Sequence, residues 1–222
     1  MALELKVESV AVEFDGHTAL SCVTLQTSAK SIAVIGVNGS GKSTFARLLN
    51  GLVTPTKGVV TVGGETPNTK TASLIFSNPD LQIVMPTVFE DVAYTLSNQK
   101  LTKTEIAERV NSALTKVGLW ELSNANCHTL SSGQKQLLSL ATAIVRSPKL
   151  LIADEPTTLL DLPNTKLITK VLHTLPIEQL VLVTHDLELA ATCEEVVWFD
   201  QGRIRKVGKP KEVIGAYRKF FE

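Results

Sequence analysis

The sequence lacks an excess of either charge, and it lacks any paired-cysteine pattern. Lys and Arg together number 22, as do Asp and Glu, so the formal net charge is zero. A balanced chain has no overall field to attract nucleic acid or an anionic membrane surface. The three cysteines, Cys22, Cys127 and Cys193, are odd in number and widely separated, without a CxxC pair. This usage favours reduced thiols in a cytosolic compartment.

Long apolar runs and targeting features are also missing. No apolar stretch approaches the length needed to cross a bilayer, and residues 1–6 have no signal-peptide layout. The chain shows no repeats at solenoid periods and no low-complexity linkers. We therefore expect the 222 residues to form one soluble α/β domain over 1–222, with a helical insert at about 87–146.

The most informative stretch that is present is GVNGSGKST at residues 36–44. It lies between a short apolar run at 31–35, typical of a buried parallel strand, and residues 45–50 of helical composition. Glycines at such a junction let backbone N–H groups turn toward an anion, at the positive end of the helix dipole. The alternative is a plain Gly/Ser turn, but a match at every fixed position favours a nucleotide phosphate loop. The predicted phosphate contacts come from Gly36, Asn38, Gly39, Ser40, Gly41, Lys42, Ser43 and Thr44, with Lys42 on the β- and γ-phosphates and Ser43 on Mg²⁺.

The regions around this loop predict an antiparallel edge and a helical stretch. Residues 3–7 alternate apolar and polar, the alternation resumes at 10–14 after a slip, and 19–26 and 59–62 read as further strands. A buried strand at 72–76 ends in a polar break at 77–82, which proline keeps out of a helix. From 87 to about 118 the apolar positions follow helical stripes.

Two carboxylates follow a second apolar strand. Asp154 and Glu155 come directly after 149–153, at the strand end where ligands bind in open α/β sheets. Asp154 would complete the Mg²⁺ shell that Ser43 begins, and Glu155 would orient or deprotonate the attacking water. The alternative interpretation is that Asp154 and Glu155 are simply solvated acids at a strand end and have no catalytic role. His185 ends the next buried strand at 180–184, at the same edge as Glu155, where we interpret it as a γ-phosphate sensor rather than a structural histidine.

Two further features have both a structural and a functional interpretation. Ser131, in the sequence LSSGQ at 130–134, is a good N-cap for the apolar-faced helix that follows, and capping alone is the structural interpretation. The strand with Asp154 and Glu155 that follows this helix directly makes that interpretation weaker. Phe14 precedes the phosphate loop by some twenty residues, where an aromatic ring would stack on adenine or else simply fill the core.

Taken in order, these motifs resemble those of ABC-transporter ATPases, from about residue 6 to 210. Residues 36–44 match the Walker A motif, 130–134 the signature LSGGQ, and 150–155 the Walker B strand with its glutamate. Asp161 falls at the D-loop aspartate, His185 at the switch histidine and Phe14 at the adenine-stacking aromatic. The resemblance implies an ABC cassette fold, a phosphate-loop ATPase core with an antiparallel β edge and a helical signature subdomain. It also implies an ATPase that binds ATP with Mg²⁺.

The family pattern implies further ligands and partners. Two cassettes pack head to tail, a homodimer being favoured, so that Lys42 of one and the signature of the other close on a shared ATP. The nucleotide contacts implied at the signature are Ser131, Ser132, Gly133 and Gln134. Residues 75–84 and 87–94 are similar to segments of energy-coupling-factor (ECF) importers for vitamins and transition metals. In that group the corresponding region binds an integral membrane coupling protein, which in turn binds a substrate-binding membrane subunit. The resemblance therefore implies that the ATPase lies at the cytoplasmic face of the cell membrane as a peripheral subunit. The segment after His185 is short and lacks the long C-terminal extension of many ECF ATPases, which is similar to the biotin-importer branch.

The sequence departs from the family pattern at three positions. Ser77 stands at the Q-loop glutamine, which implies a place near Mg²⁺, but serine is too short to reach the metal without a bridging water. Ser132 replaces the first signature glycine, and Leu159 replaces a small D-loop residue. These departures predict low activity or an unusual dependence on the partner proteins.

Two other classes of function share parts of this pattern. A small-molecule kinase would use the same phosphate loop but does not need residues 130–134. A nucleic-acid-linked ABC ATPase would carry coiled-coil insertions, tandem cassettes or a basic surface, and the sequence has none of these.

Overall fold

The apolar run before the phosphate loop forms the predicted buried parallel strand. In the computed structural model, which describes residues 3–158 and 160–222, β3 (Ser31–Ile35) is buried along its whole length. It lies between β7 (Gln179–Val183) and β8 (Glu195–Asp200) and runs parallel to both. Every position of such a strand can be apolar because both of its faces are covered.

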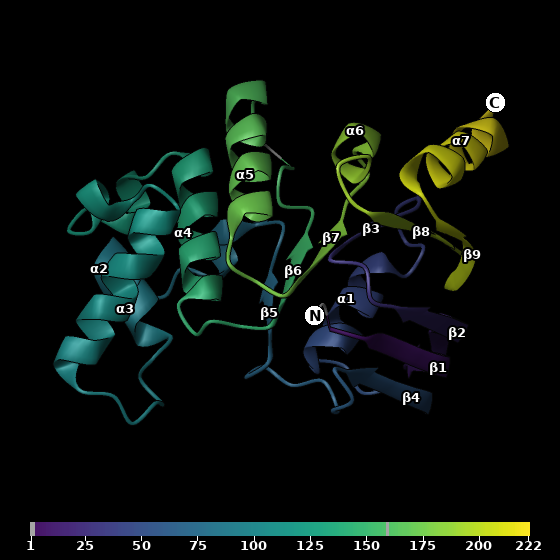
Figure 1. Cartoon of the computed structure of the whole chain (residues 1–222), viewed down its shortest axis with the longest axis horizontal. Helices are drawn as coiled ribbons and strands as arrows, with labels where there is room; N and C mark the ends of the chain where they lie inside the picture. The colour runs from purple at the N-terminus through teal and green to yellow at the C-terminus, as the bar shows by residue number, and fades with distance from the viewer. Residues whose placement is uncertain (1–2, 159) are drawn as a thin grey trace. The chain divides into compact units, whose positions relative to one another are not determined.

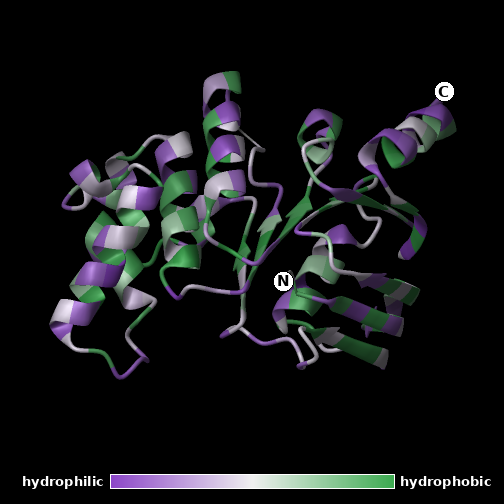
Figure 2. Ribbon diagram, in the orientation of Figure 1, coloured by the Kyte–Doolittle hydropathy of each residue, from purple (hydrophilic) through white to green (hydrophobic). Residues whose placement is uncertain are grey.

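These strands belong to a six-stranded sheet of order β5-β6-β7-β3-β8-β9. In it, β6 (Leu150–Asp154) is parallel to β7, and β9 (Arg203–Gly208) is antiparallel to β8. The edge strand β5 spans Ala72–Ile75. Figure 2 shows β6 and β7 in the green of hydrophobic residues. The carboxyl ends of β3, β6 and β7 therefore meet at one edge, where open α/β sheets bind ligands.

A second, antiparallel sheet has the order β2-β1-β4, from strands Leu5–Phe14, His17–Thr27 and Lys57–Val62. The predicted slip in the alternation is a β-bulge within one continuous strand, because the register of β1 shifts between Val7 and Val10. Ser9 in the bulge has a positive φ of 49°, consistent with the sharper local twist of bulged strands. Helix α1 (Lys42–Asn50) contacts strands of both sheets and lies between them in Figure 1.

Two helices cover the other face of the six-stranded sheet (Figure 1). Helix α6 (Leu187–Ala190) contacts β3, and α7 (Pro210–Phe221) contacts β8 and β9. An edge-on ring contact between Trp198 and Tyr217, with centroids 5.4 Å apart, joins α7 to β8. The sheet thus has α1 on one face and these two helices on the other.

The chain divides into two compact units. The first comprises the described parts of Met1–Leu74, Lys149–Glu155 and Ile177–Glu222, which hold both sheets. The second comprises the described parts of Ile75–Pro148 and Pro156–Pro176. Its α-helices are α2 (Val88–Tyr94), α3 (Lys103–Lys116), α4 (Ser132–Ile144) and α5 (Leu162–Thr174). Helix α4 packs against α2, α3 and α5.

The second unit follows the predicted helical stripes, with two interruptions. The stretch from 87 to 118 forms two helices, because Thr87 and Thr102 each begin a helix with a capping box. The break at 77–82 contains the 3₁₀ helix Pro79–Leu81, where the sequence predicted none. Proline is tolerated there because it occupies the first helical position, where its missing N–H has no partner to lose. Two more 3₁₀ turns, Trp120–Leu122 and Cys127–Thr129, precede α4.

The cysteines are unpaired, as predicted. Burial raises the pKa of the Cys127 thiol to about 11 and that of Cys193 to about 12, so both are protonated at neutral pH. Over residues 3–158 and 160–222, none of the helices combines the length and apolarity needed to cross a membrane.

Candidate functional site

Residues 36–41 form the predicted loop between β3 and α1, and two of its glycines are required by close packing. Gly36 has a φ of 152°, and a Cβ there would overlap the carbonyl oxygen of Phe199. Gly41, the N-cap of α1, has a φ of 100°, and its Cβ would lie 2.9 Å from the carbonyl oxygen of Ala19. The loop therefore lies against β8 and β2, with its backbone N–H groups at the positive end of the α1 dipole.

Lys42, the first residue of α1, folds back over this loop. Its Nζ donates hydrogen bonds to the carbonyl oxygens of Gly36 at 2.9 Å and Val37 at 3.0 Å. The residue is only 6 % exposed. Burial lowers the pKa of Lys42, while the charges of Glu155 and Asp154 oppose that shift. The ammonium is thus held within the loop where a phosphate would bind.

Ser43 and Asp154 meet at the carboxyl end of β6. The Ser43 hydroxyl donates to Oδ1 of Asp154 at 3.2 Å. Burial raises the pKa of the Asp154 carboxyl, and the hydrogen bond from Ser43 partly opposes this. A hydroxyl and a carboxylate oxygen side by side, beside a phosphate-binding loop, are ligands that Mg²⁺ takes in nucleotide sites. The residues present therefore fit a magnesium ion.

Glu155 and His185 are neighbours at the same edge, as the strand order predicted. His185 Nδ1 lies 2.7 Å from Oε2 of Glu155 and donates to it. Glu155 extends the ladder by one bond, from its N–H to the carbonyl of Val183 at 2.9 Å, and then takes a left-handed φ of 54°. This conformation is uncommon for a residue with a side chain and is found at functional sites. At this residue the chain turns out of β6, and the Glu155 carboxylate stays in contact with the His185 ring.

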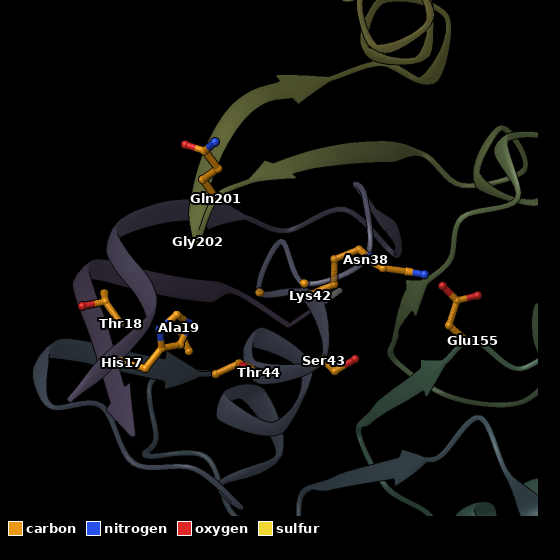
Figure 3. Close-up of a pocket in the computed structure, with 12 residues that line it drawn as sticks. His17, Thr18, Ala19, Asn38, Lys42, Ser43, Thr44, Glu155, Gln201 and Gly202 are labelled. Atoms are coloured by element: carbon orange, nitrogen blue, oxygen red, sulfur yellow. The ribbon is translucent and has the colours of Figure 1, made fainter. Parts of the chain in front are cut away.

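Lys42, Ser43 and Glu155 line one cavity of about 450 Å³, whereas Asp154 and His185 are not among its lining residues. Figure 3 shows Asn38 and Glu155 at one end of it and His17, Thr18 and Gln201 at the other. Seven of the lining residues were predicted from the sequence, and five were not, which are His17, Thr18, Ala19, Gln201 and Gly202. The missed residues belong to β2 and to the turn between β8 and β9. These residues belong to no phosphate-binding motif. Only the folded topology brings β2 and the β8–β9 turn next to the loop.

Several predicted residues of the first unit lie elsewhere. Gly36 and Ser40 support the loop without lining the cavity, and the buried Ser40 hydroxyl has no hydrogen-bond partner. Gly39 and Thr44 do line the cavity. Phe14 is not among the lining residues; it is 47 % exposed at the end of β1, opposite His17 in the hairpin.

The remaining predicted residues lie in the second unit. Ser131 is the N-cap of α4, as predicted, and forms a capping box in which Gln134 Oε1 accepts from the Ser131 N–H at 2.9 Å. Gly133 lies so close to the Asn164 side chain that a Cβ would overlap it, whereas Ser132 begins the helix. Asp161 caps α5, its Oδ1 accepting from the Asn164 N–H at 3.0 Å. Ser77 is exposed, and Leu159 lies outside the described residues.

Comparison with known proteins identifies the family. Residues 23–158 match the family described as ABC transporter. The biotin transport ATP-binding protein BioM of Rhizobium etli is 41 % identical over 221 residues, covering 97 % of this chain and 98 % of that protein. The chain is an ABC transporter ATPase.

Within this family the matches include proteins of the ECF type, in agreement with the resemblance seen in the sequence. The energy-coupling factor transporter ATP-binding protein EcfA1 of Latilactobacillus sakei is 38 % identical over 193 residues, covering 82 % of this ABC ATPase and 69 % of that protein. The structure of cbiO1 from Clostridium perfringens, described as part of the ABC transporter complex cbiONQ, superposes with a TM-score of 0.88. It is 32 % identical and covers 99 % of this chain and 94 % of its own. The chain is therefore an ATP-hydrolysing ABC subunit of the ECF type.

Proposed function

We propose that this ATPase, a single ABC domain over residues 1–222, powers an ECF importer that takes up a vitamin, with biotin as the favoured substrate. The observation that carries the proposal is the 41 % identity to a biotin transport ATP-binding protein along nearly the full length of both chains. A transition-metal ion is the alternative substrate, since ECF importers serve both classes. No residue of the ATPase selects the cargo, because selection belongs to a separate membrane subunit.

In this proposal Lys42 exchanges partners when ATP binds. Its ammonium leaves the two neutral carbonyls of Gly36 and Val37 for the charged β- and γ-phosphates. The present bonds join a charged donor to neutral acceptors, whereas the phosphates would add the attraction of an opposite full charge, so the exchange favours the bound state. The loop N–H groups and the α1 dipole add to the same attraction.

Ser43 and Asp154 would hold Mg²⁺, which would neutralise the negative charge that develops on the phosphates during transfer. Their 3.2 Å contact already places both oxygens on one side of the loop. We assign Ser77 to the outer part of this shell, where its hydroxyl would hold a bridging water in place of the glutamine amide.

Glu155 is the proposed general base for the attacking water. The carboxylate is oriented by the 2.7 Å contact with His185, and the positive φ of Glu155 sets its direction. A base within hydrogen-bond reach of the water accepts its proton as the water oxygen bonds to the γ-phosphorus and the bond to the leaving ADP breaks. His185, 63 % exposed, keeps that carboxylate in place and is available to the γ-phosphate.

The catalytic unit in this proposal is a homodimer. Phe14 would stack on adenine, and Ser131, Ser132, Gly133, Gln134 and Asp161 of a second copy would close on the same nucleotide. The capping box fixes the conformation of Ser131 and Gln134 at the start of α4. The other N–H groups of the first turn have no partner within the helix and would be available to the phosphate.

The proposed contact with the membrane coupling protein is the exposed apolar part of residues 75–94. Leu81, Val84 and Tyr94 are 78 %, 64 % and 52 % exposed, a high exposure for three apolar side chains in one short stretch. Such a contact would hold the ATPase at the cytoplasmic face of the membrane as a peripheral subunit.

The test is reconstitution with the membrane proteins that co-purify with the chain. The purified complex, placed in liposomes, should accumulate labelled biotin when Mg²⁺ and ATP face the cassette, and the Glu155→Gln variant should not. Uptake of nickel or cobalt instead of biotin would identify the alternative substrate. If no membrane protein co-purifies with the cassette, the importer proposal is contradicted.

A further inference from the structure

An ion pair joins the start of α4 to the 3₁₀ segment that follows β5. Lys135 Nζ lies 2.7 Å from Oδ1 of Asp80, across 55 positions of sequence. The lysine side chain is 18 % exposed and the aspartate 59 %. Lys135 directly follows Gln134, so its backbone is part of the first turn of α4 and its N–H donates to the carbonyl of Ser131 at 2.9 Å.

The segment that carries Asp80 is held together by its own hydrogen bonds. The Asn78 side chain accepts from the Asp80 N–H at 3.0 Å, and the Gln82 side chain accepts from the Phe76 N–H at 3.1 Å. These bonds close residues 76–82 into one short unit. Leu81, next to Asp80, is 78 % exposed and belongs to the proposed membrane contact. A force on Leu81 therefore displaces Asp80 as well.

The two elements are not tightly packed where the ion pair joins them. A cavity of about 120 Å³ lies between them, lined by Pro79 and Asp80 from one and by Ser132 and Gln136 from the other, among further residues. Gln136 is only 2 % exposed, and its Nε2 has no hydrogen-bond partner. Close-packed interiors transmit strain through contact. Beside this cavity, the ion pair is a direct link between the two elements.

We infer that Lys135 is a positioning residue, which couples the 3₁₀ segment to Ser131 and Gln134 through Asp80. When the membrane coupling protein moves the segment, the lysine carries that movement into the first turn of α4. The signature then reaches the nucleotide of the second copy in the correct position only when the partner is engaged. This inference rests on the proposed function and names the residues through which the partner would act.

Ion pairs of this exposure contribute little to folding stability. The inference therefore predicts a separation of effects that a purely structural role would not give. Lys135→Ala and Asp80→Asn should lower partner-stimulated ATP hydrolysis about tenfold, mainly through kcat, while basal hydrolysis, KM for ATP and the unfolding temperature stay unchanged. The reversed pair, Asp80→Lys with Lys135→Asp, should recover at least half of the stimulation.

The experiment compares these variants in the complex with the co-purified membrane proteins. Lys6→Ala, which breaks the exposed Lys6–Glu8 pair of 3.0 Å in β1, is the control for loss of a surface ion pair and should behave like the parental chain. Full stimulation in both single variants would overturn the inference, as would an unrescued reversed pair or a parallel fall in basal rate and unfolding temperature. Absence of stimulation in the parental complex would instead overturn the proposed function, and the inference with it.

Discussion

The packing of the phosphate loop predicts that two glycines only three positions apart differ sharply in what they tolerate. Gly36→Ala would place a Cβ onto the carbonyl oxygen of Phe199 and 2.7 Å from the Ser40 hydroxyl oxygen. Gly39→Ala would place one in open space, with no atom within 4 Å. Both residues have a positive φ, 152° and 77°, so both substitutions strain the backbone. The two sites differ in the contact and also in φ, since 77° is close to the left-handed region that other residues enter and 152° is not, and both differences disfavour Gly36→Ala.

The size of the difference follows from that contact. Backbone strain of this kind costs about 1–3 kcal/mol and applies to both variants. Overpacking adds about 1–3 kcal/mol for Gly36→Ala alone, because the Phe199 carbonyl belongs to β8, which is paired to β3 and β9 and cannot easily recede. In a domain of this size about 1 kcal/mol changes the unfolding temperature by about 2–4 °C. Gly36→Ala should thus unfold about 2–12 °C below Gly39→Ala.

Circular dichroism of the nucleotide-free proteins measures this difference directly. Calorimetry with Mg²⁺ and ATP should show in addition that both variants bind more weakly, because both distort the N–H groups of the loop. Equal unfolding temperatures, or a lower one for Gly39→Ala, would refute the argument that β8 limits the loop at Gly36.

Four further predictions concern the polar groups of the site. Lys42→Met should weaken ATP binding roughly 30- to 700-fold in calorimetry, since it loses about 2–4 kcal/mol of charge-assisted contacts; the exposed lysine variant Lys57→Met is the control, and an unchanged affinity would contradict the role of Lys42. Glu155→Gln should bind ATP normally but hydrolyse it roughly 10²- to 10⁴-fold more slowly, and a parental rate would exclude Glu155 as the base. Asp154→Asn should raise the unfolding temperature of the metal-free protein at pH 7 and weaken Mg²⁺-dependent ATP binding, and a lower unfolding temperature would contradict this. The stabilisation should disappear as the pH is lowered to the ordinary carboxyl pKa of 3.8, because a carboxyl whose pKa is raised by folding costs stability only above its unfolded pKa. Ser77→Gln should raise partner-stimulated hydrolysis and Ser77→Ala should lower it, whereas equal rates for all three residues would exclude a role in the metal shell.

The parts of the fold that the sequence predicts are those in which the signal is local. Strand β3 has the predicted bounds because five consecutive apolar or small residues precede a loop whose glycines end the strand. Ser131 was predicted as an N-cap from its residue type and from the apolar face that follows, and the structure confirms the cap. The contact of Glu155 with His185 also followed from the sequence, since both end parallel strands at one edge.

The parts that it did not predict depend on topology or on backbone conformation. His17 and Gln201 line the cavity because β2 and the turn after β8 both fold back on the loop, from positions on either side of it in the chain. Gly202 donates to the Ser40 carbonyl at 3.0 Å and accepts from the Ser21 N–H at 2.8 Å, which fixes that turn. Neither contact has a periodic or compositional signature. The left-handed φ of Glu155 is likewise set by the tertiary structure, because glutamate has no preference for it.

The electrostatics of the free site favour the bound state in a way that its motifs alone do not reveal. Burial raises the pKa of Asp154 and lowers the pKa of Lys42, so each group is held with its charge at a cost in the absence of ligand. Their mutual attraction offsets part of that cost, as do the charge of Arg47 on Asp154 and that of Glu155 on Lys42. A magnesium ion beside Asp154 and phosphates around Lys42 would supply further opposite charges at the same moment. Part of the affinity for Mg²⁺ and ATP would then come from relief of this cost of burying charges in the ligand-free protein. For the same reason, removing the charge of Asp154 should stabilise the protein while it weakens binding.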